Sequence, residues 1–402
     1  MLLSGSILMW IAALLGAPST TVPTLTHGPE PTGAARTLVL TEDLRIGPDS
    51  GGDEFIWYGN VLQIEADQQG NFFIVDSGND RIVMFDKNGK FVRQIGRRGE
   101  GPDEFYALVY FHLFKDGRAV AFQQQNFQTS YTHYNKQLEF EKTKKVVGDG
   151  RLISAVDYSE DGTWIAGYVT YFDGDSETRK REVFGPDYKT RISLGNFALK
   201  RFDASRMQDR SYWLSFLSAR LSWYAKGKIS YVAFDRDNNC YTAAGEHYEI
   251  TKWNAKLEKA MVIKRNFKPL FQGEAEMEAS VAEYKEDMMN QLPASIHEMF
   301  DDNFYRKVVE TAGYGTRKMP INGLATMEDG SLLVWHDYNR KTRVSLVDIY
   351  GKDGAFLGSF SHPNNGFKHM IFKNGFAYTL ETTEDDDVEA VRYRVALKPV
   401  SS

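Results

Sequence analysis

Three residues with metal-binding side chains occupy the same place in successive repeats of this 402-residue sequence. Glu65, His112 and Asp157 each lie five residues before the glycine of a short polar turn. Carboxylate and imidazole groups at equivalent positions could converge on a divalent ion, calcium or zinc, which would polarise a carbonyl or lower the pKa of a bound water. The alternative is that they hydrogen-bond neighbouring strands or line a wet channel, because the same position in the other repeats is apolar (Ala233, Ala325 and Met370).

A second group of polar residues falls in predicted loops of adjacent repeats. His247 lies in one loop, and His336, Asp337 and Tyr338 follow one another in the next. Histidine and carboxylate side chains brought together from two loops would bind a ligand or a metal, whereas isolated loop histidines are simply solvated.

A glycine-rich segment at 96–102 contains Arg97 and Arg98, whose guanidinium groups could hold an anion. No helix is predicted after this segment, so no helix dipole would add to the site. A run of acidic residues at 384–387 is interpreted as a solvated loop or as calcium ligands.

These candidates must be positioned by strands. Six short polar turns, centred on positions 70, 117, 162, 238, 330 and 375, separate strand-like apolar runs, with a basic period of about 45 residues and two enlarged intervals. A period of this size made of strands predicts a radial array of four-stranded sheets. The predicted fold is therefore an all-β, six-bladed β-propeller of four-stranded antiparallel blades.

The first repeat shows the pattern most clearly, with strands predicted at 61–66, 72–76, 81–85 and 91–95. Glycine and asparagine in the intervening turns supply the positive φ that tight hairpins require. The last repeat is one strand short, and an isolated run at 37–44 precedes the first. We expect this run to complete the last blade and close the ring, because an open ring leaves two unpaired edges.

The stretch from Ile64 to Asp86, with Gly70 and Asn71 at its first turn and the Asp76–Arg81 segment at its centre, resembles an NHL repeat. The segment from Gly96 to Phe105 resembles the linker of bacterial six-bladed NHL-type propellers. The resemblance implies turn-locking hydrogen bonds for Asp76, Asn79 and Arg81. Proteins of this class include binding scaffolds, lyases and hydrolases, so the resemblance implies a fold more than a function.

Both enlarged intervals fall in links between blades. Residues 196–228 are rich in aromatic side chains, and residues 272–312 are expected to form two helices between blades 4 and 5. Ser295 and Glu298 have the spacing of a capping box that would open the second helix. Counting strands places both insertions and the candidate loops above on one face of the ring, the upper face. We expect the helical pair to lie over or beside the channel mouth, and the alternative is an edge decoration with no ligand role.

The N-terminal residues predict export. An apolar run at 7–15 is too short to span a bilayer, and small residues follow it. We expect a signal peptide at 1–19, cleaved after Ser19, a disordered linker at 20–35, and the propeller at 36–400. The protein would then be secreted or periplasmic, and the alternative is an uncleaved segment that provides its only contact with a membrane.

Composition leaves two functions open. A net charge of −6 gives no reason to expect nucleic acid as a partner, and the single cysteine, Cys240, excludes an internal disulfide. The first hypothesis is a module whose upper face binds a small molecule, a glycan or a protein. The second is a metal-dependent lyase or hydrolase with its site at the propeller axis, although the family's metal-binding histidines cannot be matched to residues here.

Overall fold

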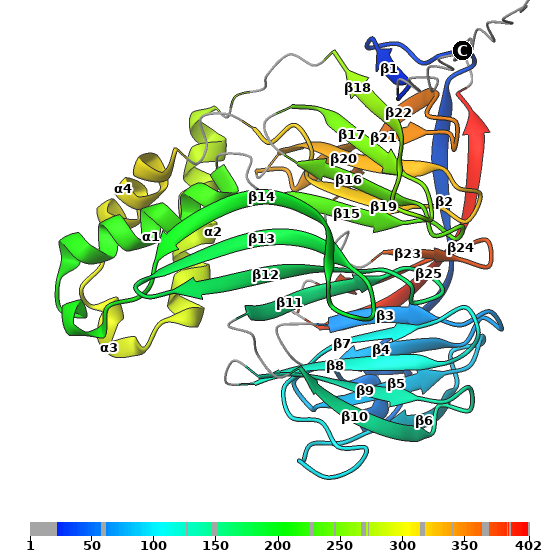
Figure 1. The fold of residues 1–402 in the computed structure, drawn as a ribbon, viewed down its shortest axis with the longest axis horizontal. Coiled ribbons are helices and arrows are strands. Elements are labelled where there is room, and N and C mark those ends of the chain that lie inside the picture. The colour runs from blue at the N-terminus through cyan, green and yellow to red at the C-terminus, as the bar shows by residue number, and fades with distance from the viewer. Residues whose placement is uncertain are drawn as a thin grey trace, which may run out of the picture.

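Six sheets form a ring of blades, and the sequential strands within each blade are antiparallel, as predicted (Figure 1). In the computed structural model the described residues are 22–57, 62–125, 128–146, 151–225, 229–244, 247–266, 271, 273–313, 318–339, 341–363, 370–383, 385 and 387–400. The predicted signal peptide lies outside them.

Each blade contains four sequential strands, or three strands and a partner from the start of the chain. Blades 1 to 3 comprise β3 (Leu62–Ala66), β4 (Phe72–Asp76), β5 (Arg81–Phe85), β6 (Phe91–Ile95); β7 (Leu108–Leu113), β8 (Ala119–Gln125), β9 (Gln128–Tyr134), β10 (Phe140–Val146); and β11 (Arg151–Tyr158), β12 (Ile165–Asp173), β13 (Ser176–Phe184), β14 (Thr190–Lys200). Blades 4 to 6 comprise β15 (Ser230–Phe234), β16 (Cys240–Ala244), β17 (Glu249–Trp253), β18 (Lys259–Arg265); β19 (Gly323–Thr326), β20 (Leu332–Asn339), β21 (Val344–Tyr350), β22 (Phe356–Pro363); and β23 (Ile371–Lys373), β24 (Phe376–Thr382), β25 (Val388–Pro399) with β2 (Arg36–Ile46).

The predicted closure of the ring is confirmed. Strand β2 pairs antiparallel with β25 over its whole length, with Leu38 opposite Leu397. Arg45 of β2 is ion-paired with Glu389 at 2.7 Å and with Glu381 at 3.0 Å. The N-terminal strand therefore covers an edge that the last blade would otherwise expose.

The prediction of a disordered linker at 20–35 is wrong for part of that segment. Strand β1 (Thr24–His27) pairs in parallel with β18, placing Leu25 opposite Ile263. The side-chain nitrogen Nε2 of His27 also lies 2.9 Å from the carbonyl oxygen of Gly354. The physical reason is that β18 is the outermost strand of blade 4, and β1 satisfies its free edge.

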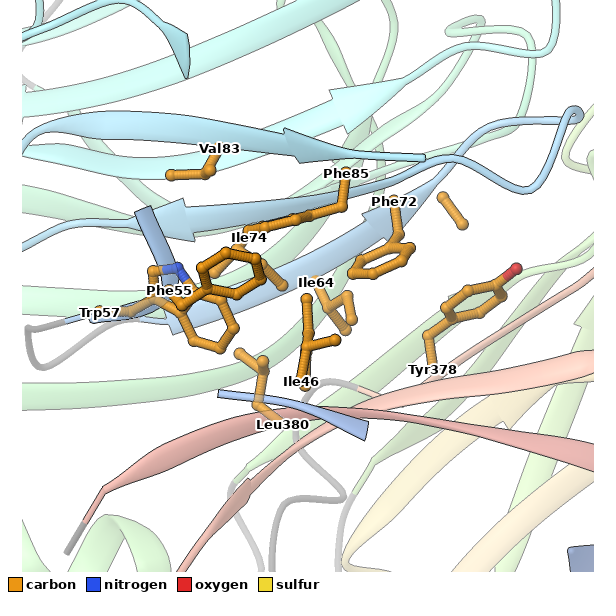
Figure 2. Close-up of a cluster of buried hydrophobic side chains, with 12 residues drawn as sticks. Ile46, Phe55, Trp57, Ile64, Phe72, Ile74, Val83, Phe85, Tyr378 and Leu380 are labelled. Atoms are coloured by element: carbon orange, nitrogen blue, oxygen red, sulfur yellow. The ribbon is translucent and has the colours of Figure 1, made fainter. Parts of the chain in front are cut away.

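Apolar cores fill the spaces between neighbouring blades. Figure 2 shows the core between blade 6 and blade 1, where Ile46 of β2 and Tyr378 and Leu380 of β24 point toward Ile64 and Phe72. Strands in such a position are apolar on both faces, which explains the uninterrupted apolar run Phe72–Val75 in the sequence.

The six polar turns form a second closed ring on the lower face, which we define as the end of the blades opposite the inter-blade links. Every turn is hydrogen-bonded to the next one around the circle. The contacts are Gln68 to Lys115 O, Lys115 N to Glu160 O, Asp161 N to Asn238, Arg236 to Glu328 O, Gly375 N to Glu328, and Asn374 to Asp67 O.

Helices gather at the upper face, at one end of the strands (Figure 1). Helix α1 (Arg210–Ala225) belongs to the link between blades 3 and 4, and α2 (Glu274–Gln291), α3 (Ala294–His297) and α4 (Asp302–Ala312) belong to the link between blades 4 and 5. Short 3-10 turns occur at Pro48–Ser50, Asp53–Phe55 and Ala204–Arg206. We call α1 to α4 the helical layer.

The insertion was predicted less accurately than the blades. The 272–312 segment contains three helices instead of two, and α1 was not predicted as a helix. The capping box at Ser295 and Glu298 is also wrong, because α3 begins at Ala294 after Pro293. The cap of α4 is Asp301, whose carboxylate accepts a hydrogen bond from the backbone N–H of Phe304 at 2.8 Å.

Candidate functional site

Two of the three predicted metal ligands meet near the lower end of the innermost strands. Glu65 on β3 and His112 on β7 approach to 3.5 Å, measured from Oε1 to Nδ1. Asp157 on β11 is instead ion-paired with Arg181 on β13 of the same blade. Its carboxylate is therefore neutralised by a guanidinium and is not available as the third ligand.

The predicted metal site is accordingly corrected. Across the described part of the chain, no group of three or more His, Cys, Asp or Glu side chains is placed to hold a metal ion. The alternative considered for these residues was hydrogen bonding between blades. The structure shows such bonding for Gln63, which lies on β3 with Glu65. Its amide accepts from the backbone N–H of Phe111 and donates to the carbonyl of the same residue, both at 3.0 Å.

Glu65 is buried, with 4% of its surface exposed, and its negative charge faces His112 and Lys373. Nζ of Lys373, from blade 6, lies 3.7 Å from Oε2 of Glu65. Burial alone would raise the pKa of Glu65, but the charge of Lys373 and the contact with His112 outweigh it and lower the pKa. The same pairing raises the pKa of Lys373 against the opposing effect of its burial.

The second predicted cluster does not form a shared site. His247 is exposed, whereas His336 is 2% exposed and lies with Nε2 3.0 Å from Asp348 Oδ1. Asp337 is ion-paired with Lys318 at 3.1 Å, and Tyr338 is partly buried in β20. The pairing of β20 with β21 shifts register between His336 and Asn339, and this bulge directs Asp337 away from the sheet.

Asp348 is the centre of a buried polar network between blades 4 and 5. It is fully buried, and its carboxylate also accepts hydrogen bonds from Tyr248, Arg265 and Ser359. Burial opposes ionisation, but the hydrogen bond from His336 and the charge of Arg265 hold the pKa of Asp348 below its usual range. The network joins two blades and thus explains His336 as a structural residue.

The two arginines of the glycine-rich segment are also engaged within the protein. Arg97 is ion-paired with Glu104 at 2.9 Å, and Arg98 with Asp80 at 2.9 Å. Both remain largely exposed, at 75% and 66% of their side-chain surface. The neighbouring carboxylates offset both guanidinium charges, which disfavours an anion there.

One surface of the helical layer combines aromatic rings with guanidinium groups. On α1 every fourth residue contributes to this surface, at Tyr212, Phe216 and Arg220. The rings of Tyr212 and Phe216 are stacked with 5.6 Å between their centroids, and the guanidinium of Arg220 lies 4.5 Å from the Phe216 centroid. Phe202 packs beside them, and Arg206 lies over the Tyr212 ring at 4.6 Å. We call these five residues the aromatic patch.

The sequence identified only part of the aromatic patch. All five residues lie in the aromatic-rich insertion at 196–228, but they were not singled out as one surface. The four-residue spacing of Tyr212, Phe216 and Arg220 was the signal that would have revealed one helical face.

The helical layer has its own apolar core and reaches the blades through charged contacts. Its buried cluster comes from the helices and from Phe300 between α3 and α4, and it includes Trp213, Leu217 and Val308. Arg220 is ion-paired with Glu177 of β13 at 3.1 Å, and on the other side Glu276 of α2 is paired with Lys318 at 2.9 Å. The aromatic patch is thereby held at a fixed place on the upper face.

A cavity of about 360 Å³ opens on the lower face between blades 4 and 5. Its lining mixes both signs of charge and comes from turns (Asp235, Arg236, Asp237, Asn239, Lys252, Glu328, Asp329, Gly330, Lys352 and Asp353). Lys252 there donates to the backbone carbonyl of Lys352, and Asp235 accepts backbone hydrogen bonds within its own turn. These contacts serve the turns themselves.

Comparison with known proteins supports the fold. Residues 54–177 match the model of the family DUF5128, described as a 6-bladed beta-propeller. No curated protein matches the sequence. None of the described helices is long and apolar enough to cross a membrane.

Several solved structures are similar at low identity. A Bacteroides fragilis protein named "Putative exported protein" is 14% identical, with 94% of this chain and 100% of that one covered and a TM-score of 0.47. A DUF4221 member from Bacteroides vulgatus is 11% identical over 90% and 99%, also at 0.47. Virginiamycin B lyase from Staphylococcus aureus is 10% identical over 91% and 90%, at 0.37. At these values the likenesses carry no argument about function.

Proposed function

We propose that this protein is an exported, NHL-type six-bladed propeller that binds a partner protein through the aromatic patch on its upper face. The proposal rests on Phe202, whose side chain is packed against other rings and still exposed. Its ring lies 5.1 Å from Trp213 and 5.3 Å from Phe216 between centroids, yet the residue remains 40% exposed. A large apolar side chain is thus held in position at the surface.

The composition of the patch favours a protein as the partner. Aromatic residues and arginine are enriched in protein interfaces and dominate their binding energy. Rings that are already stacked, with Arg206 and Arg220 lying over them, lose little conformational freedom on binding. A glycan or a small molecule is the remaining alternative among the ligands considered from the sequence.

The NHL-type assignment rests on the first blade. Asp76 accepts hydrogen bonds from Asn79 and from Nε of Arg81, both at 2.8 Å, and Arg81 continues to the carbonyl of Ile56. These contacts lock the turn and support the proposed NHL-type assignment. Export rests on the sequence of residues 1–19, and N-terminal sequencing of the secreted protein, expected to begin at Thr20, would test it.

The metal-dependent lyase or hydrolase has less support. At the axis Glu65 contacts His112 and Lys373, and among the described residues no third metal-binding side chain completes the group. We therefore do not assign catalysis to this site.

Site-specific photo-cross-linking tests the proposed binding surface. Phe202→p-benzoylphenylalanine in the full chain, expressed in its native host, should give a discrete cross-linked product with a second protein. Phe91, an exposed phenylalanine of blade 1 with 37% exposure, is the matched control position. Equal products from both positions, or a product only at position 91, would contradict the assignment.

A further inference from the structure

The contacts around Glu65 are too long for a closely packed buried ion pair. Oε1 lies 3.5 Å from both His112 Nδ1 and Gln63 Nε2, and Oε2 lies 3.7 Å from Lys373 Nζ. Direct charge-assisted hydrogen bonds span about 2.7–2.9 Å. A water molecule can bridge polar groups that make no direct hydrogen bond with each other. We call Glu65, His112 and Lys373 the axial junction.

His112 provides an independent indication at the same place. Its side chain is only 8% exposed, and neither ring nitrogen has a hydrogen-bond partner among the described residues. The ring is held by aromatic contacts, stacked on Tyr158 at 5.3 Å between centroids and edge-on to Phe114 at 5.2 Å. A buried polar group left without a partner costs about 1–3 kcal/mol, so a partner from outside the chain is expected.

The charges around the axial junction restrict what that partner is. Lys373 repels a cation, and Glu65 together with Glu160, 3.9 Å from Lys373, repels an anion. A neutral molecule that both donates and accepts hydrogen bonds satisfies the carboxylate, the ammonium and the imidazole at once. Water is the smallest molecule that does both.

We infer that the axial junction is a binding site for water, which bridges His112 and Glu65 and links the innermost strands of blades 1, 2 and 6. Buried waters of this kind make about three hydrogen bonds to otherwise unsatisfied groups. The partly exposed side chains of Lys373 and Glu160, at 20% and 27%, lie toward the lower face and give solvent a route to the site. This inference is independent of the proposed function on the upper face.

A crystal structure of the unmodified protein at about 1.5 Å tests the inference directly, with water itself as the probe. The expected result is a density peak within hydrogen-bond distance of a His112 ring nitrogen and of Glu65. The inference is overturned by an empty junction, or by a direct His112–Glu65 hydrogen bond shorter than about 3 Å.

A stability measurement provides the second test. His112→Phe keeps the aromatic packing but removes the ring nitrogens, so a bound water would lose a partner and the melting temperature should fall by about 2 °C. A dry junction predicts the opposite, because the substitution then relieves two unsatisfied nitrogens, and a higher melting temperature would contradict the inference. His133→Phe is the control, since His133 also carries a buried unpartnered nitrogen but lies on β9, outside the junction.

Discussion

Lys373 Nζ lies 3.7 Å from Glu65 Oε2, across the boundary between the last blade and the first. The two residues are far apart in the sequence and meet only when the ring is closed. The apolar core in Figure 2, which combines Ile46 of β2 with residues of blades 1 and 6, lies at the same boundary. Closure therefore combines a paired strand, an apolar core and a buried charge pair.

Removing the cation of this pair should destabilise the fold. Lys373→Met leaves Glu65 as a buried carboxylate without its main counter-charge, which should lower the free energy of unfolding by about 3 kcal/mol. Urea denaturation measures the change. Lys398→Met, at an exposed position of β25, is the control and should have little effect. Similar losses for both variants would show that the pair does not stabilise closure.

The pH dependence of stability should report the ionisation of Glu65. Because its pKa is lowered in the folded protein, Glu65 stabilises the fold above its unfolded pKa, about 4.3, and this stabilisation is lost as the pH falls through the folded value. The stability difference between the wild type and Glu65→Gln should therefore be largest near neutral pH and shrink in acid. A difference that stays constant from pH 7 to pH 3 would contradict this expectation.

The network around Asp348 should be more sensitive than any exposed carboxylate. Asp348→Ala removes the acceptor for His336 and Tyr248 and leaves Arg265 without its carboxylate, so we expect a loss of about 4 kcal/mol in unfolding free energy. Asp353→Ala, at an exposed turn position of the same blade, is the matched control. Chemical denaturation of both variants gives the comparison.

Strand β2 should contribute more to thermal stability than strand β1. Deleting 36–46 removes β2, its pairing with β25 and Ile46 from the apolar core, and should lower the melting temperature severalfold more than deleting 22–30. The shorter deletion removes β1, which pairs with β18 over four residues. Calorimetry measures both, and equal shifts would argue against closure by β2.

The blades could be predicted because their information is local. Turn residues such as Gly70 and Gly117, both at positive φ, define where strands end, and the missing strand of the last repeat required a partner. The unmatched run at 37–44 was the obvious candidate.

The candidate sites could not be predicted because they depend on non-local partners. Nothing adjacent to His336 in the sequence indicates that it contacts Asp348 or that a bulge turns Asp337 to Lys318. Asp157 likewise looks like Glu65 in its repeat, but Arg181 pairs with it. The packing of α1 is likewise non-local, because Trp213 and Leu217 are buried in one cluster with residues of α3 and α4.

The measurement that tests the central claim most directly is the affinity of the partner identified by cross-linking for two single variants. Phe202→Ala should weaken binding by about tenfold or more, as expected when an aromatic interface anchor is truncated. Phe91→Ala, which removes a similarly exposed phenylalanine from blade 1, should leave the affinity unchanged. Equal affinity of Phe202→Ala and the wild type, with both proteins folded, would contradict binding through the aromatic patch.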